Sequence, residues 1–211
     1  MFRAIGSPNW SPDGKRFVYD SVIDEHTQIC LMNVDGTNQT QLTAEPEGAM
    51  MPTWSRDGRS VYYAVRKEGT LSLWRRPLDG GNAVHIADNV FSEGIESPDG
   101  LRVFFSKLTP GIWEAPSGGG DARLVPELAG VVDSRHAFVS RTGIYFLMRE
   151  AAPWEIRYYD FASRRVTPVA SISKTPVLFT RSLSVSPDGR WMLHAQVDQM
   201  GSEIALLSDP Q

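Results

Sequence analysis

The side chains that most often carry chemistry are few and scattered in this sequence. Its four histidines, His26, His85, His136 and His194, include no two at the i, i+2 or i, i+4 spacing that metal ligands often show. Cys30 is the only cysteine, so the chain can form neither an internal disulfide nor a zinc site made of cysteines. We therefore expect no bound metal, and the redox compartment stays open.

Two common catalytic motifs are also missing. The pattern Gly-x-Ser-x-Gly, which presents the nucleophile of α/β-hydrolases, occurs nowhere in the chain. The phosphate-binding pattern Gly-x-x-x-x-Gly-Lys fails at Gly14-Lys15, because Asn9 stands where the first glycine is needed. These observations predict a non-enzymatic protein without a cofactor.

Composition and charge exclude further classes. The 21 Lys and Arg residues are outnumbered by 25 Asp and Glu residues, the sequence pI is near 5.6, and no basic run exceeds two residues. A nucleic-acid-binding chain would instead show clustered basic residues, so we expect no nucleic-acid partner. No apolar stretch reaches the length of a membrane span. We expect neither a membrane segment nor an export signal in the sequence as given, and a cytoplasmic or a periplasmic location stays open.

A short turn motif recurs along the whole chain. Its glycines are 44, 42, 43 and 46 residues apart. The copies are Ser11-Pro12-Asp13-Gly14, Ser55-Arg56-Asp57-Gly58, Ser97-Pro98-Asp99-Gly100, the degenerate Ser140-Arg141-Thr142-Gly143, and Ser186-Pro187-Asp188-Gly189. A period of about 40–45 residues is typical of the four-stranded blades of β-propellers.

Each turn is followed by runs that favour strands. Phe17-Val18-Tyr19 and Val61-Tyr62-Tyr63 are rich in β-branched and aromatic residues, and no ten-residue segment has a helical period. We predict an all-β fold, a β-propeller of four-stranded antiparallel blades within a single domain, 1–211. The five repeats are expected at 7–43, 52–87, 94–125, 136–170 and 183–211.

The first repeat resembles a known family position by position. Ser7-Pro8-Asn9-Trp10-Ser11-Pro12-Asp13-Gly14 through Gln41-Leu42-Thr43 is similar to the TolB-like or WD-like (PD) propeller repeats, and 52–58 repeats its start. More narrowly, 184–191 and 197–204 resemble the end of propellers fused to CadC-type winged-helix transcriptional regulators of bacteria. That resemblance implies a sensory or protein-binding role in signalling. The alternatives are a TolB-like envelope scaffold and the accessory propeller of a prolyl-oligopeptidase-type peptidase.

The tryptophans divide into two groups. Trp10 and Trp54 share one repeat position, and Trp74 and Trp113 share another, which predicts packing between blades. Trp154 follows Pro153 in a segment expected to be a loop, where no other repeat has an aromatic residue. We expect Trp154 to be an exposed anchor for a partner.

The predicted binding surface is the face opposite the Asp-Gly turns, where the loops vary in length and chemistry. We expect a protein partner or small ligand there, with Arg135 and Arg181 binding an acidic group and Trp154 and Phe91 giving apolar contact. The candidate site residues are Phe91, Glu93, Glu96, Arg135, His136, Trp154 and Arg181.

Closure of the ring is a separate question. The fifth repeat ends too soon after Ile204 for a fourth strand. Residues 1–6 are expected to supply that strand, since an exposed sheet edge invites pairing between chains. The alternative is that the chain is part of a larger propeller.

Overall fold

The computed structural model describes residues 3–131, 136–148, 153–177, 182–186, 188–198 and 201–208. The strands, in chain order, are β1 (Arg3–Trp10), β2 (Arg16–Ile23), β3 (His26–Asn33), β4 (Thr40–Gln41), β5 (Ala49–Trp54), β6 (Ser60–Lys67), β7 (Thr70–Pro77), β8 (Val84–Asp88), β9 (Ile95–Glu96), β10 (Arg102–Ser106), β11 (Ile112–Pro116), β12 (Arg123–Leu124), β13 (Ala137–Val139), β14 (Gly143–Met148), β15 (Trp154–Asp160), β16 (Val166–Ile172), β17 (Leu183–Val185), β18 (Trp191–Asp198) and β19 (Gly201–Ser208). A short 3-10 helix, Pro126–Leu128, stands between β12 and β13.

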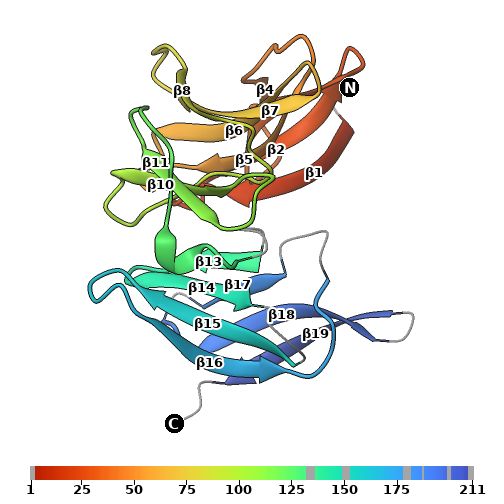
Figure 1. Cartoon of the computed structure of the whole chain (residues 1–211). Helices are drawn as coiled ribbons and strands as arrows, with labels where there is room; N and C mark the ends of the chain where they lie inside the picture. Colours follow the sequence, from red (N-terminus) through yellow and green to blue (C-terminus); the bar gives the residue numbers. More distant parts are fainter. Residues whose placement is uncertain are drawn as a thin grey trace. The chain divides into compact units, whose positions relative to one another are not determined.

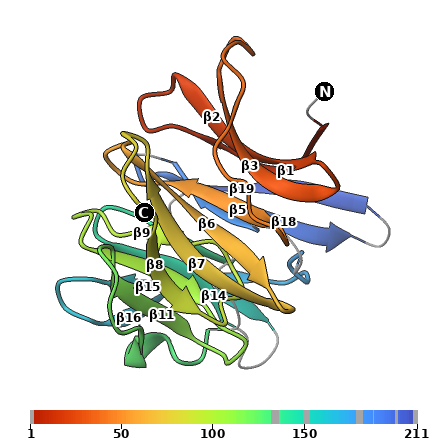
Figure 2. The ribbon, with the colours of Figure 1, turned by 90° about the horizontal axis from the view of Figure 1, so that it is seen from above.

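These strands form five sheets among the described residues, four with four strands and one with three. Each sheet follows chain order, as β1-β2-β3-β4 or β5-β6-β7-β8, and neighbouring strands pair antiparallel. Figure 1 colours the strands by their position in the sequence, and Figure 2 shows β5, β6 and β7 of the second sheet side by side. The all-β prediction with four-stranded antiparallel blades is confirmed.

The chain divides into two compact units. The first unit consists of Met1–Leu108 and Trp113–Arg123, and the second consists of Thr109–Ile112 and Leu124–Gln211. The first unit holds the β1–β4 and β5–β8 sheets entire, and the second holds the β13–β16 and β17–β19 sheets. Each unit is treated below by itself.

The repeated turns are held by one hydrogen-bond pattern. In the first, the Ser11 hydroxyl donates to Asp13 Oδ1, which also accepts the Lys15 N–H at 3.1 Å, while the Arg16 N–H donates to Ser11 Oγ at 2.9 Å. The serine-to-aspartate distances are 2.6 Å for Ser11–Asp13, 2.7 Å for Ser55–Asp57, 2.5 Å for Ser97–Asp99 and 2.6 Å for Ser186–Asp188. The glycine that follows has φ between 68° and 74° in all four turns, which is the left-handed region that glycine adopts without steric cost.

The fourth turn is built differently. The Ser140 N–H donates to the Gly143 carbonyl at 2.9 Å, so this turn is two residues shorter than Ser11 to Arg16, where the same kind of bond closes the loop. The need for glycine differs as well. A Cβ on Gly143 would overlap the Tyr159 carbonyl oxygen and lie 2.6 Å from the Tyr158 ring. Gly143 is therefore needed because there is no space for a side chain, whereas the other turn glycines are needed for their left-handed φ.

In the first unit, one face of each sheet packs against the facing side of the next sheet. Val18 and Ile29 of the first sheet pack with Trp54, Val61 and Tyr63 of the second in one apolar cluster. Such contacts remove large aromatic surfaces from water, which is the main favourable term in folding.

A polar contact accompanies the packing at the start of each interface. The Asn9 side-chain amide donates to the Pro52 carbonyl at 2.9 Å, and the Thr53 hydroxyl donates to the Gly94 carbonyl at 2.5 Å. Both donors stand two residues before the turn serine, and both acceptors three residues before the next one. Repeated packing and repeated hydrogen bonds thus come from one repeated sequence.

The packing role predicted for the tryptophans holds at three positions. Trp54 is buried, and Trp74 and Trp113 are partly buried against apolar clusters. Trp10 differs, because its side chain is 61% exposed. The first sheet covers Trp54, whereas Trp10 stands on the other side of that first sheet, where the described residues of its unit supply no covering sheet.

Residues 3–6 are not a strand of the last sheet. Arg3 pairs with Val22, Ala4 with Ser21 and Gly6 with Asp20, all within the first sheet. This corrects the expectation that residues 1–6 close the ring, as far as the described residues 3–6 are concerned. These residues extend the β1–β2 hairpin, because they pair with the neighbouring strand β2.

Candidate functional site

The loops fall into two groups according to which strands they join. The Asp-Gly turns join first to second strands and third to fourth strands, so they share one end of a sheet. The opposite end, called here the loop-rich end, carries the loops from second to third strands and from fourth strands to the next sheet. This arrangement follows directly from antiparallel order and fits the predicted two-faced organisation.

Two of the candidate site residues, Arg135 and Arg181, lie outside the described residues, so their predicted role in binding an acidic group stays a prediction. Three charged or titratable candidates are described, and all are buried. Glu93 is 7%, Glu96 4% and His136 2% exposed. The structure therefore corrects the expectation that these three side chains lie exposed on the predicted binding surface.

Glu96 is a structural carboxylate in the first unit. Its Oε1 accepts the Tyr62 hydroxyl at 2.7 Å, and its Oε2 accepts the Arg56 backbone N–H at 2.5 Å. The Arg56 Nε donates in turn to the Glu96 carbonyl at 3.2 Å. Burial first, and then the hydrogen bond to Glu96, raise the pKa of Tyr62 far above its usual value, so this phenol stays protonated and donates.

His136 belongs to the second unit and faces inward. Its Nδ1 lies 2.6 Å from the Ser182 hydroxyl, which is equally buried. Each of the two residues stands four positions before the turn serine of its repeat. A buried imidazole hydrogen-bonded to a buried hydroxyl holds two adjacent inner segments of the unit in register.

Trp154 is not a loop anchor. It begins β15, pairs with Ile172, and is 7% exposed within a cluster containing Leu147, Ile156 and Leu183. The prediction failed because Trp154 gains its burial from pairing with β16 and from residues of three other strands, none of which is visible in its local sequence.

Phe91 remains as the exposed candidate. Its side chain is 40% exposed in the loop between β8 and β9, at the loop-rich end. Its backbone N–H donates to the Ser106 carbonyl at 2.8 Å, and an isolated antiparallel bridge joins Val90 to Lys107. The next residue after Lys107 is Leu108, whose side chain is 76% exposed.

Phe91 and Leu108 are thus two exposed apolar residues on loops that this bridge joins, and they are called here the Phe91–Leu108 patch. Each stands one residue beyond a member of the Val90–Lys107 bridge, so the backbone holds the two loops together. Beside them the Lys107 ammonium lies 4.7 Å from the centre of the Trp113 ring. Sequence reasoning selected Phe91 and missed Leu108, because a single leucine in a loop has no local pattern.

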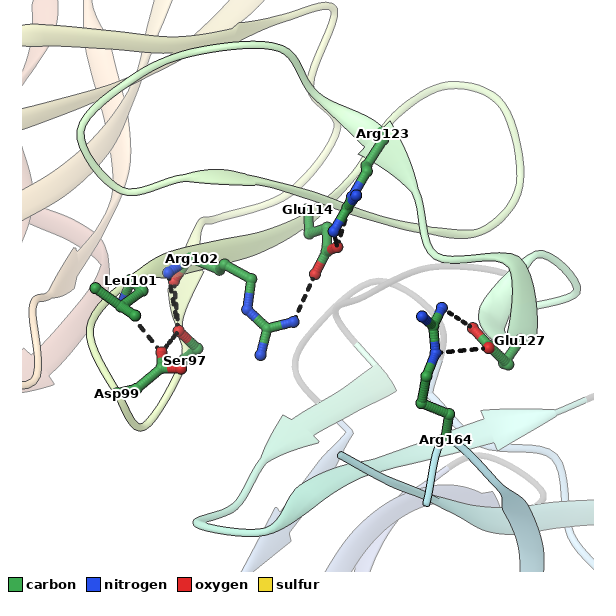
Figure 3. Close-up of polar contacts among 8 residues, drawn as sticks. All are labelled: Ser97, Asp99, Leu101, Arg102, Glu114, Arg123, Glu127 and Arg164. Carbon is green, nitrogen blue, oxygen red and sulfur yellow. Dashed lines mark hydrogen bonds and ion pairs between the residues drawn. The ribbon is translucent and has the colours of Figure 1, made fainter. Parts of the chain in front are cut away.

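The Asp-Gly end of the third sheet has a different chemistry. Figure 3 shows Glu114 between two arginines, with its Oε2 3.0 Å from Arg102 Nη1 and its Oε1 2.8 Å from Arg123 Nη2. Glu114 is buried, while the two guanidinium groups are more exposed. These charges bind one another across neighbouring strands, which favours stability of the sheet over recognition of a partner.

A second ion pair drawn in Figure 3 lies within the other unit. Arg164 Nε donates to Glu127 Oε1 at 2.9 Å and its Nη2 donates to Oε2 at 3.2 Å. This paired geometry lowers the pKa of Glu127, through the Arg164 hydrogen bond first. It links the 3-10 helix to the turn after β15.

Within the described ranges, no group of three or more His, Cys, Asp or Glu side chains is arranged to hold a metal ion. Over the same part of the chain, no helix has the length and apolar character needed to cross a membrane.

The successive sheets with their repeated Asp-Gly turns define a β-propeller protein. The family model described as PD40, TolB beta propeller domain, matches residues 2–116, more than half of the 211 residues. The chain belongs to this TolB beta propeller family. The narrower resemblance to CadC-type regulators has no such support.

Two curated relatives align with this chain. An uncharacterized protein of Agrobacterium fabrum is 31% identical over 109 residues, which are 51% of this chain and 37% of that protein. Dipeptidyl-peptidase 5 of Porphyromonas endodontalis is 28% identical over 226 aligned residues, covering 97% of this chain and 31% of the peptidase. The chain thus spans about a third of the length of these two curated relatives.

Among solved structures, TolB from Acinetobacter baumannii superimposes with a TM-score of 0.76 at 19% identity. The match covers 96% of this chain and 51% of that TolB chain. At this identity the likeness concerns the fold.

Proposed function

We propose that this chain is a non-catalytic β-propeller module that binds a protein partner through the loop-rich end of its third sheet. The observation that carries the proposal is the Phe91–Leu108 patch, with side chains 40% and 76% exposed on two loops joined by a backbone bridge. Exposed apolar side chains on a rigid support are typical anchors of protein interfaces.

The contrast between the two ends of the third sheet supports the choice of face. At the Asp-Gly end, Glu114 already binds Arg102 and Arg123, so a partner would have to compete with existing ion pairs. At the loop-rich end, Phe91 and Leu108 expose apolar surface, and its burial against an apolar side chain of a partner would be favourable. A small ligand at the same end is the alternative version of the proposal.

The biological setting is proposed on sequence likeness. The resemblance of 184–191 and 197–204 to propellers of winged-helix regulators supports a sensory part of a bacterial regulatory protein. The second candidate is an accessory propeller of a peptidase, favoured by the alignment of 97% of this chain with dipeptidyl-peptidase 5. A TolB-like scaffold is favoured by the 0.76 TM-score with TolB. In each setting the module itself does no catalysis, which the missing Gly-x-Ser-x-Gly motif supports.

The test compares capture of proteins from the native source by three forms of the tagged chain. The variant Phe91→Ser/Leu108→Ser is matched by Leu101→Ser, which removes a leucine that is 68% exposed at the Asp-Gly turn of the same sheet. We expect a partner that wild type and Leu101→Ser retain and that the double variant binds at least about tenfold more weakly. Equal retention by all three forms contradicts the proposed face.

A further inference from the structure

One buried position of the repeat holds a phenol or phenyl ring in four blades and an imidazole in the last. The position is the residue eight places after the turn serine, or its equivalent by strand register in the repeat with the shorter turn. It is occupied by Tyr19, Tyr63, Phe105, Phe146 and His194, with exposed fractions of 3%, 1%, 0%, 0% and 4%. Only the last repeat thus buries, at this position, a side chain type that titrates near neutral pH.

His194 lies within the second unit and faces its other sheet. It pairs with Leu183 across β17 and β18, so the two side chains leave the sheet on the same side. Leu183 belongs to the apolar cluster that contains Leu147 and Trp154, and Met192, two residues before His194, packs against the same cluster. The imidazole therefore lies on the side of its sheet that packs against the β13–β16 sheet.

The ring of His194 has an unsatisfied polar atom. No described residue gives its Nδ1 a hydrogen-bond partner, although the side chain is buried. By contrast, the buried His136 of the same unit has its Nδ1 2.6 Å from the Ser182 hydroxyl. A buried polar atom without a partner is costly, and a buried charge without a partner is more costly still, so this environment favours the neutral ring.

The side of the β13–β16 sheet that faces His194 carries two phenols. Tyr145 and Tyr158 pair with each other, and their ring centroids lie 4.6 Å apart. Phenols supply no negative charge near neutral pH. Glu155 and Arg157 alternate with Ile156 along β15, so they lie on the other side of that sheet, where they form an ion pair at 2.8 Å.

The remaining charged groups of these elements stand at strand ends or in β19. Asp160, at the end of β15, accepts the N–H and the hydroxyl of Ser163 in its own turn. The others are Arg164 and Arg165 in the same turn, Lys174 in the loop after β16, and Glu203, which pairs with Gln196 in the register of β18 and β19. Within the described parts of β14, β15 and β16, no free carboxylate therefore faces His194.

Burial gives this histidine a defined pH dependence. It lowers the pKa of His194 below the ordinary value of 6.5. Because the unfolded chain then binds a proton more readily than the folded chain, the free energy of unfolding is highest above pH 6.5 and falls as pH decreases through the lowered pKa. The Tyr and Phe side chains of the other repeats take up no proton in this range.

We propose that His194 makes the packing between the β13–β16 and β17–β19 sheets sensitive to acid. The neutral imidazole fits beside the apolar cluster, whereas a proton taken up from solvent creates a charge that this cluster does not stabilise. The protonated ring is driven towards water, and the contact between the two sheets of the second unit loosens.

Hydrogen–deuterium exchange of the full chain at pH 7.5 and pH 5.5, corrected for the intrinsic effect of pH on exchange, tests this proposal. In wild type, exchange at residues 144–148 and 183–185 should become at least about threefold faster at the lower pH, while residues 61–65 of the first unit should be unaffected. His194→Phe restores the residue type of the other repeats and should abolish the acid response. His194→Gln, which is neutral at both pH values, provides a second variant without the titrating ring.

The matched control is His26→Gln, which removes an exposed histidine of the first unit and should respond to acid as wild type does. Circular dichroism checks that each variant retains its sheets. Wild type whose exchange at 144–148 and 183–185 does not change with pH overturns the proposal. It is also overturned if both His194 variants keep the acid response, because another group such as His136 would then be responsible.

Discussion

Alanine in place of a turn glycine isolates the cost of a left-handed backbone. Gly14, Gly100 and Gly189 have φ of 68°, 70° and 74°, and a Cβ added at each would meet no atom within 4 Å. No packing change therefore accompanies the substitution. Each alanine variant should lose about 1 kcal/mol of unfolding free energy, which is the penalty for an L-residue in this region.

Two other glycines make the comparison quantitative. Gly118 also has open space around it, but its φ lies outside the left-handed region, so Gly118→Ala should change stability by less than about 0.5 kcal/mol. Gly143→Ala would place a methyl group against the Tyr159 carbonyl oxygen and the Tyr158 ring. Since a backbone atom cannot move aside, we expect a loss of about 3 kcal/mol or more.

Urea unfolding followed by circular dichroism and tryptophan fluorescence measures these differences. With a slope of about 1–3 kcal/mol per molar urea, a loss of 1 kcal/mol shifts the midpoint by roughly 0.3–1 M. Gly14→Ala is compared with Gly118→Ala in the first unit, and Gly189→Ala with Gly143→Ala in the second. The reasoning fails if Gly14→Ala matches Gly118→Ala, or if Gly143→Ala is the milder of its pair.

Three further outcomes are expected. The pKa of Asp57 is lowered by the hydrogen bond from the Ser55 hydroxyl first and then by one from a backbone N–H. The ionised Asp57 therefore stabilises the fold fully above its ordinary pKa of 3.8, and this stabilisation is lost as pH falls through the lowered pKa. The difference in urea midpoint between wild type and Asp57→Asn should shrink from pH 6 to pH 3. Tyr62→Phe removes the hydroxyl that donates to buried Glu96 and should lower the unfolding free energy by about 1.5–3 kcal/mol. In a double-mutant cycle with Glu96→Gln, the double variant should lose less unfolding free energy than the sum of the two single variants. Gly94→Ala would bring a methyl group within 2.9 Å of two buried branched side chains and should cost about 1–3 kcal/mol by thermal or urea unfolding, whereas an unchanged midpoint would contradict the close packing there.

The repeat architecture could be predicted because its signal is local. A serine, an aspartate and a glycine within four residues specify their own hydrogen bonds and the φ of the turn, so Ser11 to Gly14 predicts a hairpin without knowledge of the remaining chain. Recurrence of that turn, with an aromatic strand after it, was sufficient to predict four-stranded antiparallel blades.

The candidate site was harder to predict, because burial is a tertiary property. Glu93 and Glu96 have the polar side chains of a solvated rim, yet the structure encloses both. Trp154 follows a proline as a loop residue would, but its strand pairing with Ile172 buries it. Leu108 is recognisable as part of a surface patch only once the Val90–Lys107 bridge places it near Phe91.

The most direct test of the proposed binding face is hydrogen–deuterium exchange of the chain with and without its captured partner. Because loops in an interface lose solvent access, the account predicts slower exchange on binding at residues 89–94 and 107–111, the two loops of the Phe91–Leu108 patch. Residues 34–39 and 78–83, which join third to fourth strands at the Asp-Gly end, should be unaffected. Protection confined to those Asp-Gly loops, with unchanged exchange at 89–94 and 107–111, would contradict the account.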